Sequence, residues 1–428
     1  MTIWQNSARG SLLAAFALVS AFGAAAQDKP EKLTILSHKV HNTVATGDQG
    51  GDVTADWTAA NGIGAEWVTM DTGPLHERMF RELSLPETSI DIAFLLNTRA
   101  VQSVTGLLEP LDEYMAKDPI EDFDDVFGGL VDAMTFDGKL YGIPFRHASS
   151  CFHYNERILN EHGIARPTTM EELVEAAGQL TFERDDGTKV HGFLINGEGY
   201  ANVVDIARAW DGDFITLDYR VATTEPGMMK AVQTLADLYQ AEVLPTNWAA
   251  IKDEEVNTWL QTGRAAMAVA SCGRNRIYND PEKSQEAGNI KTVALPVSAE
   301  FQDRFEVAPA KVEFWTMVIP KNARNKDLSW SLIKSMLSKE NTLKAALNGN
   351  GPVRASTYDA PQMAEQLPYA AEEKAVLLVG RVPLPPFDDA AKASDIFVEE
   401  IQAAVLGMKP VEDAMASAKE RVEPLLPQ

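Results

Sequence analysis

The regular alternation of short apolar runs with longer amphipathic segments most constrains the fold of this chain. EKLTILSH (31–38) and SIDIAFLL (89–96) are β-branched and apolar and predict buried strands, whereas PLHERMFRELSLP (74–86) between them predicts a helix. The pattern resumes with a helical segment at 169–182 and a strand-like VHGFLING at 190–197. Strands that alternate with helices at this spacing indicate βαβ units in an α/β protein with mostly parallel sheets.

The length of 428 residues predicts more than one domain, because single hydrophobic cores stop growing at about 250–300 residues. Residues 1–26 are expected to lie outside that fold. SLLAAFALVSAFG (11–23) is a short apolar core, and small residues up to Ala26 offer a cleavage site, which together indicate a secretory signal peptide. The residue directly after the site is not a cysteine, so we expect no lipid anchor.

The charge of the chain is strongly acidic. The formal net charge is −24, and removal of Arg9 with the signal peptide leaves 37 basic against 62 acidic residues, or −25. Nucleic acids and anionic membranes both require a basic footprint, so neither is an expected partner.

The chain contains two cysteines, Cys151 and Cys272. In an oxidising compartment an even count permits one disulfide, but a pair alone gives no geometry. A Cys151–Cys272 bridge and two half-buried thiols both remain open from the sequence.

Catalytic motifs do not occur in the sequence. We find no Gly-rich phosphate loop, no G-x-S-x-G, no G-x-G-x-x-G after a strand and no H-E-x-x-H, and His76 in HERMF is expected to be an exposed helix residue. The prediction is therefore a protein that is not an enzyme, with no catalytic residue and no cofactor. An exported carbohydrate-active hydrolase stays as an alternative, because paired carboxylates converge in space and not along the chain.

Four histidines leave a second alternative, a zinc-binding transport protein. His38 and His41 are three residues apart after a predicted strand, and His147 and His153 lie near Pro144. Together they could hold zinc, but no compact ligand motif supports this, and the prediction is that there is no metal site.

The segment from 137 to 164, DGKLYGIPFRHASSCFHYNERILNEHGI, is unusual because a strand-like run carries many polar side chains before a helix begins. It resembles the junction segment of extracellular solute-binding proteins of the maltose-binding type. The matching positions are Tyr141 to Pro144, Tyr154-Asn155, Gly163, Pro167-Thr168 and Glu171 to Leu173. Further blocks resemble the family in the same order, at 259–271, 311–337, 351–356 and 401–426.

The resemblance implies a two-lobe periplasmic binding protein-like fold of type II, with a multi-strand hinge and a mostly parallel sheet flanked by helices in each lobe. The expected N-terminal lobe comprises 27–146 and 311–358, and the C-terminal lobe comprises 147–310 and 359–428. The lobes would close around a carbohydrate or similar small solute and deliver it, as a monomer, to an inner-membrane ABC importer. The expected location is the periplasm.

The resemblance also implies which residues face the cleft. In the family, ligand-binding side chains follow strand ends and chain crossings, as is general for open parallel sheets. The candidate ligand-binding positions are His38, His41, Asn97, Thr98, Arg99, Arg146, His147, Glu198, Tyr200, Ser271 and Arg274. Ser271 to Arg274 stand where the family often has Gly and a sugar-stacking Trp, so Trp315 or Trp210 is expected to supply the aromatic face.

Five arginines near predicted strand ends or crossings suggest a narrower hypothesis. They are Arg99, Arg146, Arg274, Arg354 and Arg381. Guanidinium groups bind carboxylate, sulfonate or phosphate groups through two parallel hydrogen bonds, which favours a sugar acid or a sulfonated sugar as the solute. The competing interpretation is that these arginines pair with the abundant acidic side chains.

Overall fold

The computed structural model describes residues 1–2 and 29–427. The predicted signal peptide therefore lies, apart from its first two residues, outside the described residues. Within the described part, none of the helices has the length and apolar character needed to cross a bilayer.

A sheet of seven strands runs through the whole molecule. β1 (Lys32–His38) pairs in parallel with β2 (Gly64–Met70) and β3 (Ile92–Leu96), and β3 pairs antiparallel with β11 (Val312–Val318). β11 in turn pairs antiparallel with β6 (Ile143–Asn155), which is 13 residues long. The far half of β6 pairs with β10 (Ile290–Val293) and β9 (Met267–Ser271).

The strand pairing differs from the prediction of a mostly parallel sheet in each lobe. Every pairing of β6 is antiparallel, and the predicted strand at 190–197 forms only the short β8 (Lys189–Val190) and two isolated parallel bridges to the segment at 265–268. The long strand β6 joins the strands of both halves into one sheet. This sheet therefore combines parallel pairs at β1 with antiparallel pairs at β6.

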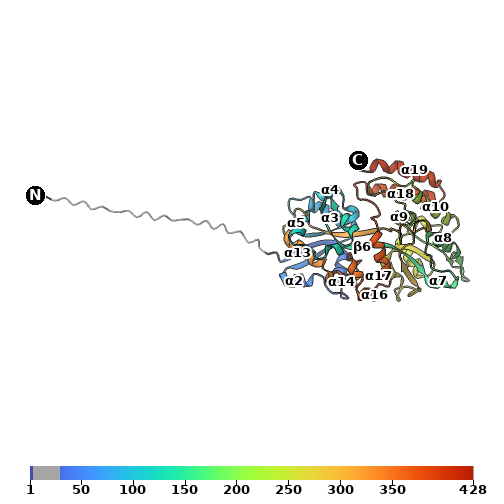
Figure 1. Ribbon diagram of the computed structural model, residues 1–428, viewed down its shortest axis with the longest axis horizontal. Helices are drawn as coiled ribbons and strands as arrows, with labels where there is room; N and C mark the ends of the chain where they lie inside the picture. The colour runs from blue at the N-terminus through green and yellow to red at the C-terminus, as the bar shows by residue number, and fades with distance from the viewer. Residues whose placement is uncertain (3–28, 428) are drawn as a thin grey trace.

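Two large hydrophobic cores lie at opposite ends of β6. The buried residues of the first core come from 33–145 and 312–377. Those of the second core come from 152–308 and 384–422. β6 contributes Phe145 to one and Phe152 to the other, so it crosses between them (Figure 1). The residue ranges predicted for the two lobes remain a proposal. Ala370 and Leu377, predicted for the second lobe, pack in the first core.

Helices cover both ends of the sheet, with β6 between the two groups (Figure 1). Around the first core lie α1 (Lys39–Ala45), α2 (Ala55–Asn61), α3 (Thr72–Leu83), α4 (Gln102–Thr105), α5 (Asp112–Lys117), α6 (Gly128–Asp132), α13 (Lys326–Met336), α14 (Lys339–Leu347) and α15 (Ala355–Tyr358). The other group comprises α7 (Glu156–Glu161), α8 (Met170–Gln179), α9 (Ala201–Arg208), α10 (Pro226–Gln240), α11 (Asp253–Gln261), α12 (Asn275–Tyr278), α18 (Ala390–Val405) and α19 (Val411–Val422). α16 (Pro361–Gln366) and α17 (Ala370–Val379) lie near the middle.

Local sequence signals set several helix starts. Thr169 caps α8 by accepting a hydrogen bond from the backbone N–H of Glu172, and Glu171 and Glu172 stand in the first turn, where the helix dipole favours negative charge. This confirms the predicted start of α8. Pro226 opens α10, where its fixed φ suits the first helical turn.

Candidate ligand-binding cleft

The paired strands β6 and β11 present one face to the space between the cores. In the antiparallel register Arg146 lies opposite Trp315, and Ala148 lies opposite Glu313. Directly opposed residues point to the same side of a sheet, and side chains alternate along each strand. Arg146, Ala148, Glu313 and Trp315 therefore share one face, which we call the cleft face.

The larger of two cavities beside the cleft face has a volume of about 690 Å³. Arg146, His147 and Ala148 of β6 border it. The remaining lining comes from Gln49 and the 346–351 segment beside the first core, from the 271–281 segment beside the second, and from Gln366, Leu367, Tyr369 and Glu373. Groups from both ends of the molecule thus converge on one space.

The smaller cavity, of about 370 Å³, also lies between the two helix groups. Thr98 and Arg99 line it from the first group, and Tyr200 lines it from the second, where Phe387 and Asp388 also contribute. Glu313 of the cleft face reaches this cavity. The hydroxyl of Ser103 donates to the carboxylate of Asp388 at 3.0 Å, which ties the two sides together.

Histidines surround Trp315 on the cleft face. The ring centroids of His38, His41 and His76 lie 6.1, 4.7 and 5.4 Å from that of Trp315. His76 is buried, which corrects the prediction of an exposed helix residue, because its ring stacks on Trp315 and accepts from the backbone N–H of Leu96. Burial lowers the pKa of His76 to about 4 and holds that of His41 well below its usual range, so both rings are neutral at pH 7.

Trp315 is itself 8% exposed and belongs to the first core, and it does not line either cavity. The aromatic surface that the sequence assigned to it comes instead from other rings. Tyr200, Phe80 and Phe387 border the smaller cavity, and Tyr369 borders the larger one. Trp210, the other candidate, belongs to the second core and donates to Glu171 at 3.2 Å, away from both cavities.

Arg146, which is partly exposed, differs electrostatically from the buried Arg208 and Arg354. Among the described residues no carboxylate lies within 4.0 Å of its guanidinium, and its Nε is buried without a hydrogen-bond partner. Burial lowers the pKa of Arg146, and the carboxyls of Glu373 and Glu313 oppose that effect from a distance. A guanidinium remains charged under these conditions, so the cleft holds an unpaired cation.

The opposite face of β6 carries a buried polar network, and its members His147 and Glu373 also border the larger cavity. The hydroxyls of Ser149 and Tyr358 donate to the two carboxylate oxygens of Glu373 at 3.0 and 3.1 Å, and Nε2 of His147 lies 2.8 Å from the Tyr358 hydroxyl. Burial raises the pKa of Glu373 to about 7, although both hydrogen bonds and Arg146 oppose the shift. Burial lowers the pKa of His147 to about 3, so its ring is neutral.

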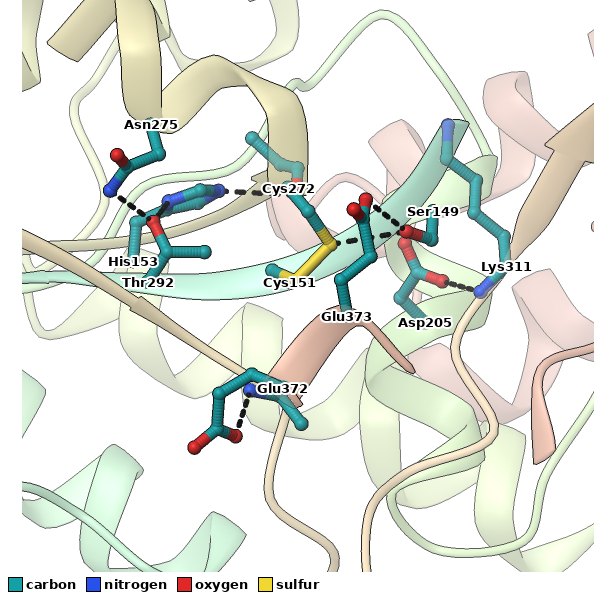
Figure 2. Close-up of a disulfide and its surroundings, with 12 residues drawn as sticks. Ser149, Cys151, His153, Asp205, Cys272, Asn275, Thr292, Lys311, Glu372 and Glu373 are labelled. Carbon is teal, nitrogen blue, oxygen red and sulfur yellow. Dashed lines mark hydrogen bonds between the residues drawn. A yellow bond between two sulfur atoms is a disulfide. The ribbon is translucent and has the colours of Figure 1, made fainter. Parts of the chain in front are cut away.

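Cys151 of β6 and Cys272, which follows β9, form a disulfide beside this network (Figure 2). The Ser149 hydroxyl lies 3.2 Å from Sγ of Cys272, and both sulfurs are buried together with Tyr369. The structure thereby resolves the alternatives that the sequence left open for these two residues.

Several predicted site residues lie away from both cavities. The structure contradicts the prediction that Arg354 faces the cleft, because this residue is fully buried. Its guanidinium donates to the carbonyls of Leu337, Asp122 and Glu121 and to the Asp125 carboxylate. Its guanidinium holds the 121–125 loop in place through these bonds. This agrees with the competing interpretation, in which the arginines pair with acidic side chains of the protein.

Four other predicted residues also have partners elsewhere. Oδ1 of Asn97 accepts from the backbone N–H of Phe314, which anchors β11. Arg274 donates to Asp253 at 2.8 Å, and Glu198 is exposed with Lys252 at 3.7 Å. Arg381 lies within 4.0 Å of Asp211 and Asp213, and its backbone pairs with the segment before β11.

The four histidines of the zinc hypothesis do not form one group. The rings of His38 and His41 lie together, whereas His147 bonds Tyr358 and His153 bonds Thr292 on β10 (Figure 2). In the part of the chain that the structure describes, no three His, Cys, Asp or Glu residues are placed to hold a metal ion. The geometry gives the zinc alternative no support.

The cavities also contain residues that the sequence reasoning missed. They include Phe80, Ala148, Asn275, Arg276, Asn350, Glu313, Glu373, Phe387 and Asp388. The period-two alternation of a crossing strand could have indicated Ala148 together with Arg146, and Glu313 together with Trp315. The residues from α12 and α17, and Asn350 after the end of α14, give no local signal.

The architecture of two cores joined by crossing strands matches a known family. Residues 52–371 match the family model of the bacterial extracellular solute-binding proteins, and the chain belongs to this family. The resemblance inferred from the sequence is thereby confirmed. The family is non-enzymatic, as predicted.

Individual relatives are distant. A probable amino-acid ABC transporter periplasmic-binding protein of Sinorhizobium fredii is 22% identical over 93% of this chain and 92% of its own length. A mannitol-binding protein of Pseudomonas aeruginosa is 21% identical over 71% of this chain and 70% of its own. The maltose-bound structure of T. maritima MalE3 has a TM-score of 0.75 at 22% identity, covering 92% of this chain and all of that one. This likeness confirms the predicted α/β periplasmic binding protein fold.

Proposed function

We propose that the protein captures a carbohydrate or carbohydrate-like solute, such as a sugar, sugar acid, sulfonated sugar or polyol, between its two lobes. After export to the periplasm it delivers this solute, as a monomer, to an inner-membrane ABC importer. The observation that carries the proposal is that residues from both ends of the molecule line each cavity. Aromatic, hydroxyl and charged side chains line both cavities, and the larger one also has side-chain amides.

This lining suits the surface of a sugar. Hydroxyl groups need donors and acceptors in one plane, and the C–H face of the ring packs on aromatic side chains. In the smaller cavity Tyr200 and Phe387 supply rings, and Thr98, Glu313 and Asp388 supply polar groups. A solute that touches both lobes binds the closed state more tightly, so binding itself selects closure.

The names of similar proteins support the same class of solute. The structure from T. maritima contains maltose, and the P. aeruginosa relative is a mannitol-binding protein. The S. fredii relative carries the name of an amino-acid system, which makes amino acids the competing class. A calorimetric panel of sugars, polyols and amino acids decides between them.

We expect Tyr200→Ala to weaken binding of the best carbohydrate by about tenfold, because an aromatic contact contributes about 1 kcal/mol beyond its buried area. Titration calorimetry of the purified protein measures this. Tyr239→Ala is the matched control, since Tyr239 lies on α10 with its hydroxyl bonded to the Thr246 carbonyl and lines neither cavity.

A panel in which only amino acids bind would overturn the carbohydrate assignment. Mass spectrometry of the recovered solute provides the test of the hydrolase alternative. The solute should return unchanged, and release of reducing ends from polysaccharide would instead favour an enzyme.

A further inference from the structure

Arg146 is partly exposed, but its Nε is buried, and its guanidinium has no protein partner in the described chain, unlike those of the buried Arg208 and Arg354. The guanidinium of Arg208 bonds the Asp213 carboxylate and the carbonyls of Pro309, Arg381 and Val382. Arg354 is equally well bonded, to three carbonyls and one carboxylate. This contrast is notable in a chain with 62 acidic residues and a net charge of −24.

The charged side chains that line the larger cavity strengthen the contrast. They are Arg146, Arg276, Asp280 and Glu373. Both carboxylates are already engaged, Asp280 with Lys283 at 3.5 Å and Glu373 with the Ser149 and Tyr358 hydroxyls. The described chain contains no ion pair for either arginine, whereas Asp280 is paired with a lysine and burial raises the pKa of Glu373 to about 7. The net charge that these four side chains present to the cavity at pH 7 is therefore positive.

Glu313 does not neutralise Arg146 either. It shares the cleft face with Arg146, but it lies at the smaller cavity and its one ion pair is with Lys311, at 3.9 Å. A charge that is largely withdrawn from water without a protein partner is unfavourable, and an anionic ligand in the cavity can supply that partner. Asn275, Asn350 and Ser271 beside it offer further hydrogen-bonding groups.

We propose that the solute places an anionic oxygen group, a carboxylate or a sulfonic or sulfate group, in the larger cavity, where this group accepts hydrogen bonds from the guanidinium of Arg146. The proposal rests on the proposed function and narrows it: the solute is an acidic carbohydrate or polyol, with its hydroxyl groups toward the amide and hydroxyl side chains of the cavity. A planar guanidinium fork matches such groups with two parallel bonds.

Matched pairs of solutes test this by titration calorimetry. Gluconate is compared with sorbitol, glucuronate with glucose, and glucose 6-sulfate with glucose, which separates carboxylate from sulfate. The acidic member of at least one pair should bind roughly 10- to 100-fold more tightly than its neutral counterpart. Arg146→Met should remove that advantage and leave the affinity for the neutral member nearly unchanged. Arg324→Gln, an exposed arginine paired with Glu87, should leave every affinity unchanged.

A ligand-free measurement gives a second readout. Because Arg146 has no partner in the protein, Arg146→Met should keep or raise the melting temperature of the empty protein. A marked decrease would show a structural role and overturn the inference, as would acids that bind no better than their neutral partners.

Neutral sugars binding alone would overturn this inference and leave the proposed function intact. If acetate or succinate binds as tightly as the sugar acids, the carbohydrate assignment fails while the role of Arg146 stands; no binding by any pair contradicts both.

Discussion

Reduction of the Cys151–Cys272 disulfide is expected to lower the free energy of unfolding by roughly 3–5 kcal/mol. The bond joins residues separated by 121 positions, so it removes much conformational freedom from the unfolded chain. Both sulfurs are buried beside Tyr369. The effect acts mainly on the unfolded state.

Guanidinium unfolding with and without reductant measures the loss. The variant with both Cys151→Ala and Cys272→Ala is the control, because its midpoint should not respond to reductant. Thiol titration of the denatured samples verifies that the bond is broken. Equal midpoints for the oxidised and fully reduced wild-type protein would contradict the prediction.

Much of the fold followed from local sequence patterns. The apolar runs that became β1 and β3 and the capped start of α8 are encoded within a few residues, so they are visible without tertiary information. The family resemblance of the segment at 141–155 then indicated the junction between the lobes, which the structure shows as β6. The pairing of β6 was not visible, because a strand buried at both ends looks the same with parallel and antiparallel neighbours.

The candidate site was less accessible from sequence. Arg146 and Arg354 are both arginines near predicted crossings, but one is unpaired at the cleft and the other is fully bonded inside the first core. The contacts of Arg354 with the 121–125 loop, which is distant in sequence, distinguish the two arginines, and these contacts exist only in the folded protein. Trp315 likewise looked like a stacking platform, and only the approach of His41 and His76 shows that it is largely covered.

Glu373 could not be found from sequence for the same reason. It lies on α17, an ordinary helix with no motif, and it meets β6 only in the folded protein. Its environment comprises Arg146, His147, Tyr358 and Tyr369, and it has a measurable consequence for stability.

The stability of the protein should fall as pH rises through the titration of Glu373. The carboxyl has a pKa of about 7 in the folded state, against 4.5 as its ordinary value, and desolvation is the main cause. Between these values the folded state binds more protons than the unfolded state, so the free energy of unfolding decreases with pH. The penalty is absent below about pH 4 and amounts to roughly 3 kcal/mol above about pH 8.

Glu373→Gln isolates this contribution from the other carboxyl groups. The amide loses part of the hydrogen bonding to Ser149 and Tyr358, which costs stability at every pH, but it cannot ionise. The free energy of unfolding of the variant minus that of the wild type should therefore increase by roughly 2.5 kcal/mol between pH 5 and pH 8. Urea unfolding at four pH values measures the difference. Glu372→Gln, on the same helix with its carboxylate bonded to the backbone N–H of Ala294 (Figure 2), should give a difference that changes far less with pH. A pH-independent difference for Glu373→Gln would show that the buried carboxyl is already ionised at pH 5, and that Arg146 and the two hydroxyls outweigh its desolvation.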